Sequence, residues 1–300
     1  MTDSLDAVRI SFGPAGITAM NAVLALVMFG VALDLRAEDF RRVFQMPRAF
    51  VLGFVGQYLL FPALSFLLIL ALRPPASFAL GLLLIASLPA GNMSNYLTHM
   101  ARGDTPLSIS MTALSTVSAP IATPLVFAFW APLVPGAEGL MHSMQLDPFA
   151  LLGSMVAVLG VPLAAGMWLR ARRPAFADRW LRPLRRLSLV FFVVFVVGAV
   201  GANIGTLREV LGQIAPAIMA QNALALLGGY GVAWLGRLRE ADRRAIGFEI
   251  AIRNAGLGLA LVLTFFEGLG GMALATAWYG AWDLLTGGVL AQWWARRPPA

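Results

Sequence analysis

Apolar residues fill long stretches of this chain, and short polar or arginine-rich segments separate the stretches. A helix of about 20 apolar residues crosses the roughly 30 Å of hydrocarbon in a bilayer. The pattern therefore predicts an all-α polytopic membrane protein with nine spans and no soluble domain between them. The predicted spans are residues 14–34, 49–72, 78–101, 105–133, 148–169, 187–206, 213–236, 245–266 and 272–295.

Two of the predicted spans contain residues that interrupt a helix. Residues 78–101 carry the segment PAGNMSN in their middle, and residues 245–266 carry Glu249, Arg253 and Asn254. Polar, Gly- or Pro-interrupted spans in corresponding positions of two halves are typical of inverted-repeat transporters. Backbone that leaves helical geometry inside a membrane must face protein or a water-filled cavity. We therefore expect the two breaks to meet near the membrane midplane and to form the site.

Each interrupted span is followed by one further span that closes its half of the chain. The chain is expected to form one transporter unit over residues 1–300, with half-repeats at residues 14–133 and 148–295. None of the connections between spans has the length or composition of a soluble domain, so no further domain is expected.

Arginine positions predict the orientation of the spans. All 22 basic residues are arginine, and 18 of them fall in alternate connections and at the C-terminal end. Arg9, Arg73 and Arg208 fall on the opposite side. By the positive-inside rule the C-terminus is predicted to be cytoplasmic and the N-terminus outside, which agrees with an odd number of spans. The predicted location is the inner (cytoplasmic) membrane of a bacterium.

Composition narrows the class of protein. Hydrophobic residues make up 59% of the chain and charged residues 12%, and the mean hydropathy is +0.78. Soluble domains contain about 25% charged residues, so this chain could not cover a soluble surface. A soluble enzyme, a disordered chain and a secreted disulfide scaffold are excluded, and the absence of cysteine excludes thiolate chemistry. The net charge of +7 reflects the arginines described above, and nucleic acid is not an expected partner.

Glu249 is the first candidate for chemistry, because a carboxylate at the centre of a membrane costs about 2.5–3.5 kcal/mol. It should face the protein interior and have a cationic partner. One interpretation is an internal ion pair with Arg253, four residues further along the same predicted helix. Another is that Glu249 borders an ion site, and the two interpretations are compatible.

Small polar residues near the first interruption form a second cluster, which consists of Ser94, Asn95, Ser108 and Thr112. Ser108 and Thr112 are four residues apart and share a helix face. Together with the amide oxygen of Asn95 and the carboxylate of Glu249, their hydroxyls would supply only oxygen ligands, which hard cations prefer. Hydrogen bonding between helices is the alternative interpretation of the same spacing.

Two further polar residues lie inside apolar spans. Asp283 either pairs with Arg253 or lines a substrate cavity, and Gln57 is expected to hydrogen-bond a neighbouring helix. An intramembrane hydrolase would need paired aspartates or a serine–histidine pair. Asp283 has no obvious aspartate partner within a span and His99 no obvious serine partner, so an enzyme is not expected.

These residues lie in segments that resemble the bile acid/sodium symporter family. The family's first broken helix and the helix after it are similar to residues 89–124, PAGNMSNYLTHMARGDTPLSISMTALSTVSAPIATP. Its second broken helix is similar to residues 249–261, EIAIRNAGLGLAL, and the end of an early helix to residues 27–35, VMFGVALDL. The resemblance covers nearly the whole chain. It implies a core domain with two crossing broken helices, a smaller panel domain, and the nine-span form of the family.

The resemblance also implies which residues bind sodium. The first sodium site corresponds to Ser94, Asn95, Ser108, Thr112 and Glu249. The second corresponds to Gln57, Glu249, the backbone carbonyls of Ile250 and Ile252, and the position of Arg253, where family members carry Gln. A guanidinium has only donors and cannot ligate a cation. Our hypothesis is that Arg253 abolishes the second site and acts as a built-in cation.

Substrate binding is implied beside the crossing, at Asn92 and Asn254, with Arg253 and Asp283 as further candidates. Ala90 stands where the family has a glycine, and Asn92 where some members have threonine. These departures leave the identity of the substrate open, from a bile-acid-like compound to a small carboxylate.

The sequence therefore predicts a secondary transporter that imports an organic anion with sodium, one ion or two. The first alternative is a proton-coupled or sodium-independent transporter of the same fold, in which Glu249 is protonated or Arg253 replaces one sodium. An exporter and a non-transporting receptor are further alternatives, while an arsenite exporter would be expected to carry a membrane cysteine. Expected partners are the anion and membrane lipid.

Overall fold

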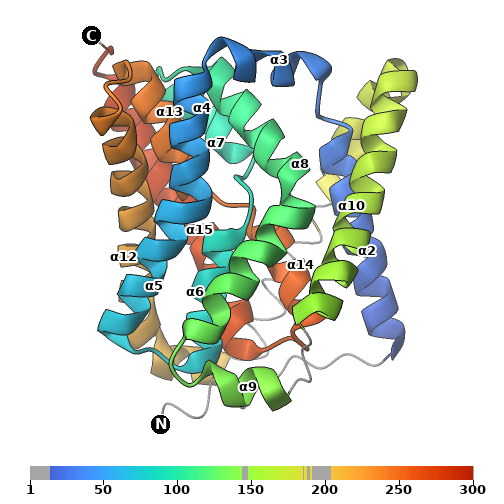
Figure 1. Ribbon diagram of the computed structural model, residues 1–300, viewed down its shortest axis with the longest axis vertical. Helices are drawn as coiled ribbons and strands as arrows, with labels where there is room; N and C mark the ends of the chain where they lie inside the picture. Colours follow the sequence, from blue (N-terminus) through green and yellow to red (C-terminus); the bar gives the residue numbers. More distant parts are fainter. Residues whose placement is uncertain (1–13, 144–147, 185, 188–189, 191–203, 300) are drawn as a thin grey trace.

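The computed structural model describes every residue except 1–13, 144–147, 185, 188–189, 191–203 and 300 (Figure 1). The described part consists of helices joined by short connections, and an isolated antiparallel bridge joins Ala90 and Arg253. The prediction of an all-helical protein is therefore confirmed for these residues.

The observed helices follow the predicted spans, of which 187–206 lies mostly outside the described residues. The helices that coincide with the predicted spans are α2 (Pro14–Ala32), α4 (Pro47–Val55) continued by the π-helical turn Gly56–Leu60 and α5 (Phe61–Leu72), α6 (Ala76–Ser87), α7 (Met93–Met100), α8 (Thr105–Trp130), α10 (Pro148–Arg172), α12 (Ile204–Leu235), α13 (Glu240–Ala251), α14 (Ala255–Phe265) and α15 (Gly270–Ala295). The short connecting helices α3 (Ala37–Gln45) and α9 (Ala137–Ser143), and the 3-10 turn Ala131–Leu133, are additions that the span pattern did not predict.

Four helical segments of the described chain are long and apolar enough to cross a membrane: Pro47–Leu72, Thr105–Leu133, Gly153–Arg172 and Ile214–Leu235. Helices α6 and α14 are shorter, at 12 and 11 residues, because each forms only one half of an interrupted span. This composition of the described part fits a polytopic membrane protein.

Helices α2 and α10 pack against each other at one edge of the molecule, on the right in Figure 1, whereas α4, α5 and α12 lie toward the opposite edge. Helix α8 contacts α10 on one side and α6, α7 and α13 on the other. Helix α3 crosses the upper end of the molecule from α2 to α4 and packs on α8. The start of α13 and the C-terminal end lie at this same end, so several arginine-rich segments share one end of the molecule.

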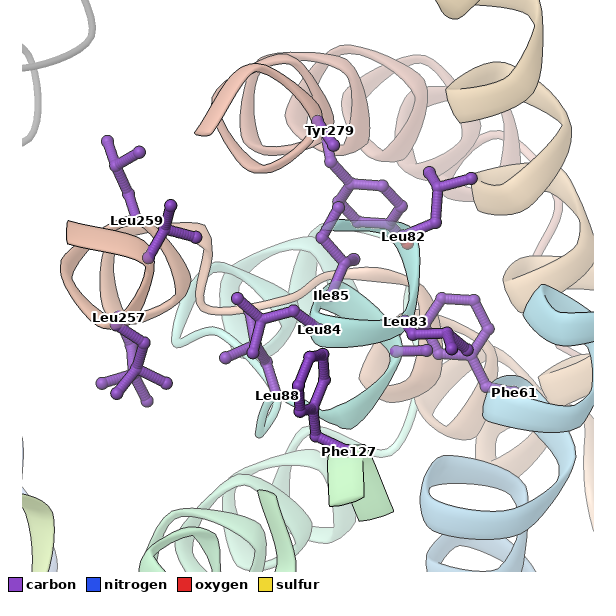
Figure 2. Packing of buried hydrophobic residues seen from close by; sticks show 14 of the residues in the cluster. Phe61, Leu82, Leu83, Leu84, Ile85, Leu88, Phe127, Leu257, Leu259 and Tyr279 are labelled. Atoms are coloured by element: carbon purple, nitrogen blue, oxygen red, sulfur yellow. The ribbon is translucent and has the colours of Figure 1, made fainter. Parts of the chain in front are cut away.

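Helix α6 is enclosed on all sides, and its residues from Ser77 to Ser87 are all buried. In Figure 2, Leu82 points toward Tyr279 of α15 and Leu83 toward Phe61 of α5. A helix surrounded by other helices needs apolar residues on every face. The continuous apolar stretch that predicts a membrane span here therefore also builds the centre of the core.

Both interrupted spans break where the sequence stops favouring a helix. Helix α6 ends at Ser87, and Leu88 is extended, with φ −68° and ψ 157°. The following Pro89 disfavours helical geometry at the residue before it. Helix α13 ends at Ala251, and Ile252 is extended, with φ −94° and ψ 108°. Both breaks leave backbone carbonyls of a last helical turn available to partners outside the helix.

Candidate functional site

The two interrupted segments pair with each other through their backbones. The amide of Gly91 donates to the carbonyl of Ile252 at 2.9 Å, and the amide of Asn254 donates to the carbonyl of Pro89 at 3.1 Å. The amide of Ala90 donates instead to the hydroxyl of Ser115 on α8, at 3.3 Å. The polar backbone exposed by each break is thus satisfied by the other break and by α8, as burial in a membrane protein requires.

Gly91 permits this close approach, and its replacement by Ala is expected to open the crossing. A Cβ atom on Gly91 would lie 2.8 Å from the carbonyl oxygen of Arg253 and 3.1 Å from its carbonyl carbon. Backbone cannot yield as a side chain does, so we expect Gly91→Ala to lower the free energy of unfolding by about 1–3 kcal/mol. Thermal melting of the purified protein measures this. Gly288→Ala is the control, because a Cβ there meets no atom within 4 Å, and equal melting of the two variants would contradict the prediction.

Glu249, near the end of α13, lies at the centre of a buried oxygen cluster. Its Oε1 accepts from the hydroxyls of Ser94 and Ser108, both at 2.5 Å. The hydroxyl of Thr112 lies 2.9 Å from Oε1 and 3.0 Å from Oε2. Glu249, Ser94 and Ser108 are fully buried, and Thr112 is 3% exposed. The structure therefore brings together side chains of α7, α8 and α13 around one carboxylate.

Asn95 completes this cluster. Its Oδ1 lies 2.8 Å from the hydroxyl of Ser108 and 3.1 Å from that of Thr112, and the hydroxyls of Ser94 and Thr112 lie 3.4 Å apart. The five residues of the predicted first sodium site thus form one connected network of contacts.

The cluster contains more short oxygen–oxygen contacts than it has hydroxyl hydrogens to form hydrogen bonds across them. Seven oxygen–oxygen contacts lie within hydrogen-bond distance, while the three hydroxyls carry one hydrogen each. At most three of the contacts can be hydrogen bonds at one time while Glu249 is ionised. The remaining lone pairs face one another, which is the donor set of a hard cation.

Arg253 follows the second break and is 4% exposed. One terminal nitrogen of its guanidinium, Nη1, donates to the carbonyl of Leu88 at 2.8 Å, and the other, Nη2, to the carbonyl of Gln57 at 3.2 Å. The amide of Gln57 satisfies its neighbours when its oxygen faces Nη1, at 2.9 Å. The ring of Phe61 lies 4.8 Å from the guanidinium carbon. The guanidinium is therefore held by carbonyl oxygens and an aromatic face.

Gln57 belongs to the π-helical turn Gly56–Leu60, where the amide of Phe61 bonds the carbonyl of Gly56. Such turns are rare and occur frequently at functional sites. Of the predicted second sodium ligands, Gln57 contacts the Arg253 side chain, and the carbonyl of Ile252 accepts from Gly91. A guanidinium thus lies against Gln57, one of those ligands.

The predicted ion pair between Glu249 and Arg253 is absent from the described residues, and this interpretation was wrong. Helix α13 ends at Ala251, so the two residues do not share a helix and lack the expected spacing of one turn. Glu249 contacts hydroxyls, while Arg253 contacts the carbonyls of Leu88, just after α6, and of Gln57 in the π-helical turn.

Asp283 also binds differently from the predicted side-chain pair with Arg253. Its Oδ2 accepts from the backbone amide of Arg253 at 3.0 Å, and the residue is 1% exposed. The carboxylate therefore caps the segment that leads into α14, where the positive end of a helix favours a negative charge. Asp283 therefore contacts the second break from α15.

Sequence reasoning missed the polar residues that support the second break. The carbonyl of Ala251, freed by the end of α13, accepts from the hydroxyl of Tyr279 at 2.8 Å and from Nδ2 of Asn222 at 3.2 Å. The hydroxyl of Thr286 donates to Oδ1 of Asn222 at 2.7 Å. The available signal was the adjacent amide pair Gln221 and Asn222 in the apolar span of α12, which alone does not identify its partners.

The predicted substrate residues Asn92 and Asn254 lie on either side of the crossing. Asn92 is exposed and immediately precedes α7, while Asn254 is partly buried and precedes α14. The Oδ1 of Asn254 accepts from the amide of Leu257 at 3.1 Å and caps α14. Each residue stands at the N-terminal, positive end of a half-helix, a position that favours anions.

Comparison with known proteins agrees with this arrangement. The model of the Sodium Bile acid symporter family matches residues 21–209. The sodium-dependent transporter YocS of Bacillus subtilis is 29% identical over 91% of this chain and 82% of its own length. The probable sodium/metabolite cotransporter BASS1 of Arabidopsis thaliana is 30% identical over 92% of this chain, which spans 66% of that protein.

The P3 protein of Bos taurus is 29% identical over 78% of this chain, which spans 48% of the relative. The family and the sodium-dependent relatives are transporters, not enzymes. The family model covers more than half of the chain, and the relatives extend the match over its interrupted spans. This chain belongs to the sodium bile acid symporter family.

Proposed function

We propose that this chain is a secondary transporter that couples the entry of a small organic anion to the entry of one sodium ion. The observation that carries the proposal is the buried cluster around Glu249, in which seven oxygen contacts share three hydroxyl hydrogens. Ser94, Asn95, Ser108 and Thr112 would hold the ion together with the carboxylate.

The charge and chemistry of the cluster support sodium rather than other metals. One carboxylate among neutral oxygens matches a monovalent cation. The described residues contain no group of three His, Cys, Asp or Glu side chains that would hold a transition metal or a divalent ion. The sodium-dependent relatives support the same ion.

Coupling to protons is the alternative that the same cluster supports. A proton on Glu249 would supply a fourth hydrogen to the seven contacts and would remove a buried charge. Sodium coupling and proton coupling differ in the driving force, because transport by a proton-coupled carrier depends on a pH gradient and not on sodium.

Arg253 supports a stoichiometry of one sodium ion. Its guanidinium already places a positive charge among the carbonyls of Leu88 and Gln57, and it offers no lone pair to a second ion. In this proposal Gln57, Ile250 and Ile252 bind no sodium, and Arg253 is the permanent cation of the crossing.

The crossing also supports an anionic substrate. The positive ends of α7 and α14 face this region, and Asn92 is exposed beside it. We propose that Asn92 and Asn254 bind the substrate. The buried guanidinium of Arg253 would attract the negative charge of the substrate without contacting it, and Asp283 would cap the break rather than contact the substrate. The substrate class is an organic anion, bile-acid-like or a smaller carboxylate.

The overall transport cycle follows from the arrangement of the helices. We propose nine spans in two inverted half-repeats, with the C-terminus in the cytoplasm and the N-terminus outside a bacterial inner membrane. Helices α4 to α8 and α12 to α15 form the core, and α2 with α10 forms part of the panel. A movement of the core against the panel would switch access to the crossing.

The direct test is uptake of labelled organic anions by the protein reconstituted in sealed vesicles. We expect uptake of at least one carboxylate or sulfonate to require an inward sodium gradient. Replacing sodium with potassium at constant ionic strength is expected to reduce uptake to that of empty vesicles. Uptake that follows an inward proton gradient without sodium would favour the alternative.

A further inference from the structure

A surface of arginine and aromatic side chains lies on residues 174–184, 186 and 187, which are helical and away from the crossing. The segment follows α10 and packs on α2, because Ala177 and Leu184 are buried against Leu33. The guanidinium of Arg170 binds Asp178 at 2.6 Å and lowers the pKa of that carboxyl. These contacts fix the segment on the molecule and determine which of its side chains face outward.

The outward side chains form two rows. Phe176 and Trp180 are four residues apart and are 46% and 44% exposed, with ring centroids 6.0 Å apart. Arg179, Arg182 and Arg186 are exposed and spaced by three and four residues, which places them on a separate helix face. Leu187, 50% exposed, continues the apolar row.

Within the part of the chain that the structure describes, the three arginines of this row have no ion-pair partner. An apolar row that includes tryptophan, beside a cationic row, is typical of a helix that lies in the membrane interface. Guanidinium groups bind phosphate through paired hydrogen bonds. A phosphate-bearing lipid surface would supply the counter-charge that the described residues lack.

We propose that this surface binds anionic phospholipids at the arginine-rich end of the molecule. Arg179, Arg182 and Arg186 would contact the lipid phosphates, while Phe176 and Trp180 lie among the upper acyl chains. Anionic lipid would then hold the segment that follows α10, and with it α2, at a fixed depth in the membrane. This inference does not depend on the ion or substrate of the transporter.

The test uses Trp180 as the reporter in vesicles of phosphatidylcholine that carry brominated lipid, which quenches tryptophan on contact. The difference between the unmodified protein and Trp180→Phe isolates the signal of Trp180. We expect brominated phosphatidylglycerol to quench Trp180 more than brominated phosphatidylcholine at the same mole fraction. Each arginine near an anionic surface contributes about fivefold to binding, which corresponds to about 1 kcal/mol.

The triple variant Arg179→Gln, Arg182→Gln and Arg186→Gln is therefore expected to reduce the preference for phosphatidylglycerol at least about tenfold. If this variant does not fold, Arg182→Gln alone is expected to reduce it about fivefold. The matched control removes three other exposed arginines through Arg48→Gln, Arg102→Gln and Arg296→Gln, and should keep the preference.

Three outcomes would overturn the proposal. Equal quenching by both brominated lipids in the unmodified protein would show that the surface does not select anionic lipid. An equal loss in the control variant would show an effect of overall charge only. Inorganic phosphate that removes the preference at constant ionic strength would assign the arginines to a soluble anion.

Discussion

Replacing Glu249 with Gln is expected to abolish sodium-driven uptake while leaving the protein folded. Gln keeps the size of the side chain and one carbonyl oxygen but removes the only charge among the cluster oxygens. Losing one partner of a buried charge pair costs about 3–5 kcal/mol, which lowers the affinity for sodium by at least about a hundredfold. Uptake of the labelled anion against sodium concentration, in sealed vesicles, measures the loss.

The matched control is Glu138→Gln on α9, which removes the same charge from an exposed position. It should transport as the unmodified protein does. Thr112→Val tests the neutral ligands separately, because it removes one oxygen and keeps the shape, and we expect a weaker sodium dependence rather than a complete loss. Sodium-dependent uptake by Glu249→Gln at the affinity of the unmodified protein would exclude Glu249 as the charged ligand.

Replacing Arg253 with Gln is expected to make transport sensitive to membrane voltage. Under the proposed stoichiometry, the unmodified protein moves one sodium ion with one monovalent anion and therefore no net charge. Gln removes the guanidinium from the carbonyls of Leu88 and Gln57 and supplies an amide oxygen, so that a second sodium ion can bind there. One added charge is worth about 2.3 kcal/mol per 100 mV, or roughly 50-fold in accumulation.

The measurement is uptake in vesicles whose potential is set by potassium and valinomycin. An inside-negative potential should raise uptake by Arg253→Gln and leave the unmodified protein unchanged. Arg253→Lys keeps the fixed charge and should remain insensitive to voltage. If folded Arg253→Gln transports one sodium ion per anion without response to voltage, Arg253 does not take the place of an ion.

Much of the architecture could be predicted because membrane burial imposes a strong pattern. Apolar stretches of sufficient length predicted the long described helices but not the connecting helices α3 and α9, and PAGNMSN predicted where the first break lies. The break occurs where Pro89 disfavours helical geometry at Leu88 and Gly91 allows the second backbone to approach. Local sequence was sufficient for these features because local sterics cause them.

The contacts of the charged residues could not be predicted in the same way. The spacing of Glu249 and Arg253 predicted an ion pair only if the helix continued, and it ends at Ala251. The partners of Arg253 come from Gln57 and Leu88, far away in sequence. Asp283 binds a backbone amide, which no side-chain pattern reveals. These contacts depend on how the two breaks cross, which is a property of the whole fold.

The position of the neutral ligands was easier to predict than that of Arg253. Ser108 and Thr112 are on one face of α8 by spacing alone, and they do contact the same carboxylate. Their identity as sodium ligands is a proposal that rests on the excess of lone pairs in the cluster.

The central claim, that the crossing binds sodium through Glu249, is tested most directly by ion-dependent stability. Purified protein is titrated with NaCl or KCl at constant total salt, and its melting temperature is measured for the unmodified chain and for Glu249→Gln. A ligand that binds only the folded state stabilises it by about 2.7 kcal/mol at a hundred times its Kd. The account predicts that sodium alone raises the melting temperature of the unmodified protein and has no such effect on Glu249→Gln. Equal melting in sodium and potassium, or stabilisation by sodium that persists in Glu249→Gln, would contradict it.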